Sequence, residues 1–182
     1  QKFFEEHFGR KARVGWCPDG FILHPGSLPQ LLRQAGLRLW IHKRPREKMG
    51  HLPLLPYRWR GFDGSEVLVF RSNNKGNGLP TVSEGTLAPE SKSDLAVMAE
   101  AFESIGFHEM WGPMGVGDIG GINSYKLPRT TDRVRLAFST PSGFLQSLEK
   151  SGITDRLEVV NGSLPPIFTG ALTTWAEVKQ LN

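Results

Sequence analysis

The sequence has little cysteine and no long apolar segment. Cys17 is the single cysteine among the 182 residues, so an internal disulfide and a zinc site built from cysteines are both excluded. No run of about 18 apolar residues is present, and we therefore expect no membrane-spanning helix. No signal peptide is visible, which favours the cytoplasm. The chain starts on Gln1 without a methionine and stops within a helical pattern, so we expect it to be a piece of a longer protein.

Several signatures of catalysis and nucleotide binding are missing as well. The sequence contains no HExxH, GxSxG, GxGxxG or GxxxxGK[ST] motif. The histidines do not have the spacing of a zinc site, and His24 is the one histidine close to a candidate site described below. These absences argue against a zincin protease, a serine hydrolase of the nucleophile-elbow type and a P-loop or Rossmann nucleotide site.

The charge does not indicate a nucleic-acid partner. The formal net charge is +4 and the pI is near 9.4, but the basic residues are scattered. Residues 41–48, "IHKRPREK", form the one basic cluster, and Pro45 and Glu47 interrupt it. Nucleic-acid modules usually gather positive charge on one stripe beside aromatic side chains. We therefore interpret the cluster as a solvated loop and expect no nucleic-acid binding; the oligomeric state stays open.

What is present is an alternation of strand-like and helical patterns in one unit, residues 1–182. Hydrophobic residues make up 38% and charged residues 22% of the chain, as in globular proteins. The alternation predicts an α/β fold with a largely parallel sheet, but it does not separate a doubly wound sheet from a barrel. A segment rich in Asn, Gly, Pro and Ser, residues 72–93, is predicted to be a long loop. The expected strands cover 11–16, 37–43, 57–60, 66–70, 107–114, 133–138 and 157–162. The expected helices cover 27–36, 94–106, 140–152 and a segment that begins at Thr174, and residues 3–8 also have helical spacing.

Two aspartates stand just after strand-like runs. Asp19 follows "VGWCP", and Asp118 lies in "GVGDIGG". Loops at the carboxyl ends of strands line the pockets of α/β proteins, and two carboxylates across a pocket can hydrolyse a glycoside as nucleophile and acid/base. The alternative is that both are turn residues, with glycine supplying the turn geometry. Trp16, Trp59 and Trp111 also fall near strand ends, where they either pack in the core or offer a face to a sugar.

The order of three motifs resembles the catalytic domain of glycoside hydrolase family 38, the α-mannosidases. "WCPDGF" (residues 16–21), "LPQLLRQAG" (28–36) and "WRGFDGSEVL" (59–68) resemble its W-x-P-D-x-F-G, L-P-Q-[IL]-L and W-x-G-x-D-G-S-x-V-L segments. The resemblance implies a seven-stranded (β/α) barrel that is truncated here at both ends. It implies a catalytic Zn²⁺, with Asp19 as nucleophile and metal ligand and Asp118 as acid/base, and an α-mannoside or oligosaccharide substrate.

The same motifs depart from the family pattern near Asp19. Residues Ile22-Leu23 replace the family's glycine and its neighbour, and one residue is inserted before Leu28. The H-x-D pair that supplies two zinc ligands in the family would precede Gln1, and a further histidine ligand would follow Asn182. We therefore expect a zinc-dependent retaining α-mannosidase whose isolated 182 residues are inactive. The alternative is a degenerate homologue that binds carbohydrate, or packs in an assembly, without catalysis.

Overall fold

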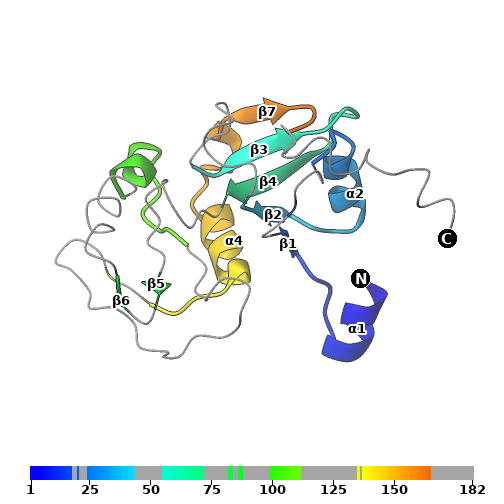
Figure 1. Ribbon diagram of the computed structural model, residues 1–182, viewed down its shortest axis with the longest axis horizontal. Coiled ribbons are helices and arrows are strands. Elements are labelled where there is room, and N and C mark those ends of the chain that lie inside the picture. Colours follow the sequence, from blue (N-terminus) through cyan, green and yellow to red (C-terminus); the bar gives the residue numbers. More distant parts are fainter. Residues whose placement is uncertain are drawn as a thin grey trace, which may run out of the picture.

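A five-stranded mixed sheet forms the centre of the protein (Figure 1). The strand order is β1-β2-β4-β3-β7, with β1, β2 and β4 parallel to one another, β3 antiparallel to β4 and β7 parallel to β3. The strands are β1 (Val14–Cys17), β2 (Leu39–His42), β3 (Tyr57–Arg60), β4 (Glu66–Arg71) and β7 (Val159–Asn161). This computed structural model describes residues 1–17, 20, 24–43, 55–71, 82–83, 86–87, 99–111, 135 and 137–164. No helix in these ranges is long and apolar enough to cross a membrane.

The α/β class expected from the sequence is confirmed, but a closed barrel is not. Within the described residues, β1 pairs with β2 alone and β7 pairs with β3 alone, so the sheet is open at both edges. One of the four strand pairings is antiparallel, because the tight β3–β4 hairpin reverses the chain direction within the sheet. The sheet is therefore mixed and largely parallel.

Local sequence signals set the ends of the elements. Helix α4 (Pro141–Lys150) begins after Thr140, whose hydroxyl accepts a hydrogen bond from the Gly143 amide at 3.1 Å. Helix α2 (Leu28–Gln34) begins after Ser27, and the chain leaves it through Gly36 at a φ of +79°. In the β3–β4 turn, the Asp63 carboxylate accepts hydrogen bonds from the amide and hydroxyl of Ser65, at 3.0 Å and 2.6 Å. These hydrogen bonds lower the pKa of Asp63.

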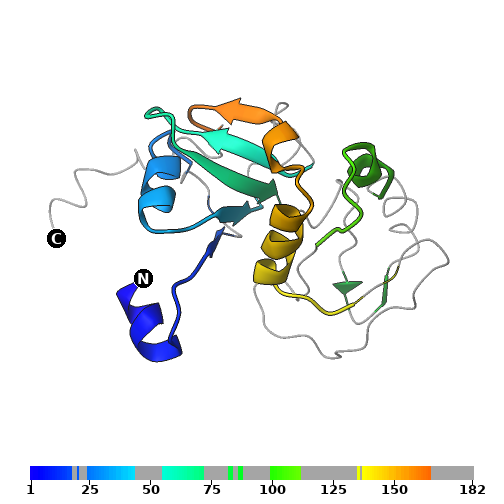
Figure 2. The same ribbon diagram turned by 180° about the vertical axis from the view of Figure 1, so that it is seen from behind.

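The two faces of the sheet carry separate cores because side chains alternate along each strand. Helices α4 and α2 lie on different sides of this sheet (Figures 1 and 2). On one face, α4 and the helical residues 99–104 pack against the sheet. On the other face, α2 and the segment after β7 cover it. The first core comprises Leu39, Ile41, Phe70, Phe102, Phe107, Trp111, Phe144, Leu145, Leu148, Ile153 and Leu157. The second comprises Leu32, Tyr57, Trp59, Val67, Val69 and Leu164.

Two predicted strands are wrong where the structure describes them. Residues 107–111 form no strand, although Phe107 and Trp111 are buried in the first core. Residues 135, 137 and 138 are also outside any strand, and Phe138 is exposed. The physical reason is that an apolar or alternating pattern shows which side chains can be buried, whereas a strand also needs a partner backbone with free hydrogen-bonding groups.

The remaining elements are short. Within the predicted loop 72–93, β5 (Val82–Ser83) and β6 (Thr86–Leu87) form an antiparallel pair, and the other residues of that loop lie outside the described ranges. Helix α1 (Lys2–Phe8) buries none of its residues, and Phe3, Phe4 and Phe8 are exposed.

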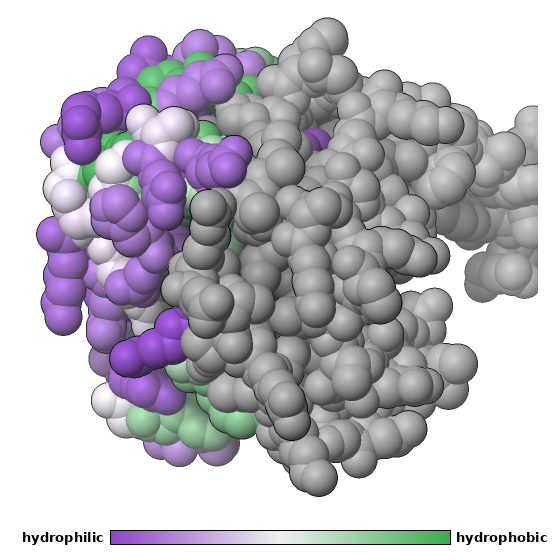
Figure 3. All heavy atoms as spheres, turned by 90° about the vertical axis from the view of Figure 1, so that its left-hand side faces the viewer, coloured by the Kyte–Doolittle hydropathy of each residue, from purple (hydrophilic) through white to green (hydrophobic). Residues whose placement is uncertain are grey.

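Figure 3 shows another side of the molecule, where the described surface is mostly hydrophilic with small hydrophobic patches.

Candidate active site

Three parallel strands end side by side at one edge of the sheet. Their last residues are in register: Cys17 of β1 lies opposite His42 of β2, and His42 lies opposite Arg71 of β4. Strand β3 runs the other way and begins at the same edge with Tyr57, which pairs with Val69. In α/β proteins, chemistry is concentrated at the carboxyl ends of parallel strands. We call this edge the carboxyl edge.

Of the two predicted catalytic residues, Asp19 is the one close in sequence to a residue of this edge. Asp19 follows Cys17 by two positions, so it belongs to the connection that leaves the carboxyl edge from β1. The side chain of Asp19 lies outside the described residues, and so does Asp118. The prediction that the two carboxylates meet across one pocket therefore stays a prediction.

A buried polar cluster lies at this edge, on the face of the sheet that α2 covers. We call His24, His42, Tyr57 and Arg71 the polar cluster; all four are buried. His42 Nε2 and the Tyr57 hydroxyl are 3.0 Å apart and share a hydrogen bond. The ring centroids of His24 and His42 are 4.9 Å apart. Four separate segments thus bring polar side chains into one buried volume, which costs free energy unless those groups satisfy one another.

Burial within the cluster keeps the Tyr57 phenol neutral. Burial raises the pKa of the Tyr57 phenol above its ordinary value, and the positive charge of Arg71 partly opposes this effect. The hydroxyl therefore keeps its proton throughout the neutral range and is available to hydrogen-bond with His42.

Described residues that follow Asp19 in the connection from β1 to α2 make close contacts with β1 and with the segment after β7. At Gly20, a Cβ atom would lie 2.6 Å from Cys17 Sγ, so a larger residue would fit only if the Cys17 side chain turned away. After Asp19, the His24 carbonyl accepts a hydrogen bond from the Leu164 amide at 3.0 Å. The Gly26 amide donates to Ser163 Oγ at 2.9 Å.

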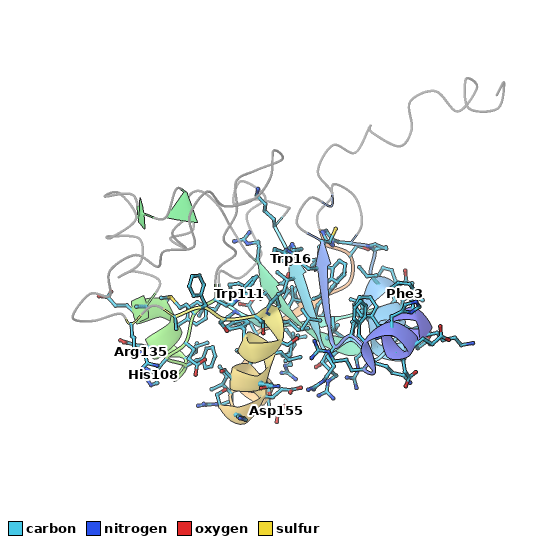
Figure 4. All side chains as sticks on the ribbon, turned by 90° about the horizontal axis from the view of Figure 1, so that it is seen from below. Phe3, Trp16, His108, Trp111, Arg135 and Asp155 are labelled. Atoms are coloured by element: carbon cyan, nitrogen blue, oxygen red, sulfur yellow. The ribbon has the colours of Figure 1, made fainter. Side chains whose placement is uncertain are left out.

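The structure separates the roles of the three tryptophans that the sequence left open. Trp59 is buried in the second core, where its Nε1 donates to the Gly162 carbonyl at 2.6 Å. Trp111 is buried in the first core. Trp16 is 47% exposed and meets Trp111 edge to face, with ring centroids 5.7 Å apart (Figure 4). Trp16 is therefore the one of these three that can offer an aromatic face to a ligand at the carboxyl edge.

The described side chains do not by themselves make up a zinc site. Among the residues that the structure describes, no group of three His, Cys, Asp or Glu side chains is placed to hold a metal ion. Asp19, the ligand that the resemblance implies, is not one of these residues. His24 follows Asp19 in the same connection, and its ring packs with that of His42 within the polar cluster.

The comparison with known protein families identifies the chain. The sequence model described as the N-terminal domain of glycosyl hydrolases family 38 matches residues 1–177. The chain belongs to glycoside hydrolase family 38. The resemblance seen in the three sequence motifs is thereby confirmed.

Two curated relatives and one solved structure are similar to this family 38 chain. Alpha-mannosidase G of Dictyostelium discoideum is 28% identical over 151 residues, which cover 82% of the chain and 14% of that protein. An alpha-mannosidase of Saccharomyces cerevisiae is 35% identical over 70 residues, 38% of the chain and 6% of that protein. A crystal structure of a family 38 protein from Enterococcus faecalis matches with a TM-score of 0.42 and 16% identity, covering 88% of the chain and 16% of that structure. The chain thus spans only a small part of the relatives it matches.

Sequence reasoning about this family 38 chain missed three members of the polar cluster. His42, Tyr57 and Arg71 occupy strand ends, and in sequence they read as ordinary members of an alternating strand. One sequence signal could have indicated a buried polar group here. A histidine and an arginine occupy the last positions of two strands, on the same side as the apolar residues that face a core. His24 was already singled out because it follows Asp19 closely in the sequence.

Proposed function

We propose that the protein containing this chain is a zinc-dependent, retaining α-mannosidase that hydrolyses terminal α-mannosyl residues. The chain would form part of its catalytic domain, a (β/α) barrel of the seven-stranded type. Membership of family 38 supports the proposal, as do the names of the two relatives. The observation that carries it is the position of Asp19, two residues beyond a strand whose end lies in register with two other parallel strands.

In this proposal two carboxylates divide the reaction. Asp19 attacks the anomeric carbon of the terminal mannose and forms a glycosyl-enzyme bond, while Asp118 gives a proton to the leaving oxygen. Asp118 then takes a proton from water, and the water displaces Asp19, so that two inversions retain the configuration. A zinc ion bound with Asp19 as one ligand would orient sugar hydroxyls and stabilise negative charge.

The described residues would contribute the walls of the sugar site. Trp16 ends in solvent at the carboxyl edge and is braced by Trp111, which itself packs against Phe70 and Phe144. An aromatic ring held in this way loses little conformational freedom on contact with a sugar, because its neighbours already fix it. We expect the exposed indole to stack on an apolar face of the glycan.

The deciding experiment uses the full-length protein and an aryl α-mannoside. Asp19→Ala should abolish turnover, because the substitution removes the nucleophile and a zinc ligand together. Asp155→Ala is the matched control: it removes an exposed aspartate of the short helix Thr154–Arg156 and should leave turnover unchanged. Activity of Asp19→Ala within about tenfold of wild type would rule out the nucleophile, whose loss costs far more than that in related chemistry.

The same experiment tests the non-catalytic alternative. The replacement of the family's glycine by Ile22 favours that alternative, since a Cβ limits how closely backbone and ligand approach. A degenerate homologue would bind α-mannosides in calorimetry while showing no turnover in the presence of zinc. Turnover by the wild-type protein, lost in Asp19→Ala, would exclude it.

A further inference from the structure

We propose that His24, His42 and Tyr57 are positioning residues for the proposed nucleophile. They would hold the connection from β1 to α2, which carries Asp19, at a defined place on the carboxyl edge. The role given to Asp19 rests on the proposed function above. The contacts that place His24, His42 and Tyr57 do not rest on the proposed function, because they are contacts between described residues.

The first step is the bond between His42 and Tyr57. His42 ends β2 and Tyr57 begins β3, and β4 lies between these two strands in the sheet. Their 3.0 Å hydrogen bond therefore joins two strands that are not neighbours, across the end of the strand between them. Both side chains are buried, and a hydrogen bond shielded from water is stronger and more sharply directed than an exposed one. The bond gives the carboxyl edge a rigid lateral connection.

The second step is the position of His24 against this bond. Its ring lies 4.9 Å from the ring of His42 and 6.1 Å from that of Trp59, centroid to centroid. Its backbone carbonyl accepts a hydrogen bond from Leu164, which follows β7. His24 is thus held through both its side chain and its backbone, and the connection can shift there only if the polar cluster rearranges.

The third step links His24 to Asp19 through Gly20. A Cβ placed on Gly20 would lie 3.7 Å from His24 Nε2 and 2.6 Å from Cys17 Sγ. Gly20 is therefore close to both the Cys17 side chain and the His24 ring, and a larger residue there would displace Cys17 Sγ. Because Asp19 is bonded directly to Gly20, a displacement of His24 or Cys17 is passed to the residue that carries the proposed nucleophile. A displacement of about 1 Å at a reacting group can cost about a hundredfold in rate.

The test uses four variants of the full-length protein. Tyr57→Phe removes the hydroxyl but keeps the ring, and His42→Leu removes both ring nitrogens. His42→Gln is the rescue variant, because its side-chain amide can still hydrogen-bond with Tyr57. Thr140→Ala is the stability control: it removes the α4 cap on the opposite face of the sheet, away from the polar cluster.

Two measurements are made on each variant. The first is kcat and KM for an aryl α-mannoside, corrected for the folded fraction. The second is amide hydrogen exchange, followed by mass spectrometry, in the peptide that spans residues 17–24 and in the peptide of α4. We expect Tyr57→Phe and His42→Leu to lower kcat at least about tenfold, within the range for a misplaced reacting group, with KM within about twofold. In these two variants, exchange in peptide 17–24 should also become faster. In His42→Gln, most of the wild-type kcat and most of the slow exchange should be restored.

The outcomes are decisive in both directions. Unchanged exchange in peptide 17–24 would overturn the proposal, and so would a kcat that stays within about twofold of wild type or behaves as in Thr140→Ala. A wild-type protein without mannosidase turnover would refute the proposed function instead. The hydrogen-exchange measurement would then still decide whether His24, His42 and Tyr57 hold the connection from β1 to α2.

Discussion

Replacing Gly61 by alanine should destabilise the protein, although the backbone at Gly61 is not in the left-handed region that favours glycine. A Cβ at this position would lie 2.7 Å from the Gly26 carbonyl oxygen and 3.2 Å from Pro29 Cβ. The Gly26 oxygen is a backbone atom, and it accepts a hydrogen bond from the Phe62 amide at 2.9 Å. The new methyl group can therefore fit only if the start of α2 moves away from the β3–β4 turn.

The size of the effect follows from opposing contributions. Alanine restricts the unfolded chain, which stabilises the folded state by about 0.4–1 kcal/mol. Overpacking against fixed atoms costs about 1–3 kcal/mol, and a weakened Gly26–Phe62 hydrogen bond adds about 1 kcal/mol. The net loss for Gly61→Ala is about 1–3.5 kcal/mol in the free energy of unfolding. For a chain of this size that corresponds to a fall in Tm of roughly 2–14 °C.

Gly26→Ala is the matched control for this prediction. A Cβ at Gly26 would meet the Phe62 ring at 2.6 Å, but the Phe62 side chain is 76% exposed and can turn into solvent. We expect a change within about 0.5 kcal/mol, because the atoms nearest to the new methyl group belong to this exposed side chain. Urea unfolding of the 182-residue chain, followed by far-ultraviolet circular dichroism, compares the two variants. The reasoning fails if Gly61→Ala is as stable as wild type, or if Gly26→Ala loses more.

Three further predictions concern pH, metal and substrate. Because the pKa of Tyr57 is raised in the folded state, the folded protein keeps a phenol proton that the unfolded chain loses above pH 10.0. The free energy of unfolding should therefore fall as pH rises past that value. In Tyr57→Phe, alkaline unfolding should lack this part of the pH dependence. The isolated chain should bind zinc only weakly in calorimetric titration, since the resemblance places one zinc ligand, Asp19, within it; submicromolar stoichiometric binding would contradict this. In the full-length protein, Trp16→Ala should raise KM several-fold with a smaller change in kcat, whereas Trp16→Phe should keep most of the affinity; equal kinetics in all three proteins would exclude stacking on Trp16.

Much of the local structure could be predicted from the sequence because its signals are local. The sequence predicts strands at 57–60 and 66–70, and they form the β3–β4 hairpin at Tyr57–Arg60 and Glu66–Arg71 with the "FDG" turn between them. The helix predicted at 140–152 forms as α4, and Thr140 at its start makes the capping hydrogen bond. The strands predicted at 107–114 and 133–138 were wrong where described, because pairing depends on distant backbone that no local pattern specifies.

By itself, the sequence determined the family, the α/β class and the position of Asp19 just beyond a strand, since motifs and periodicity lie along the chain. The tertiary structure alone decided which of three tryptophans stays exposed, because exposure depends on which elements cover a residue; Trp16 is uncovered while Trp59 and Trp111 are packed. It also decided that His24, His42, Tyr57 and Arg71 meet. These residues come from four segments, and the parallel register of β1, β2 and β4, together with the reversal into β3, brings their ends to one edge.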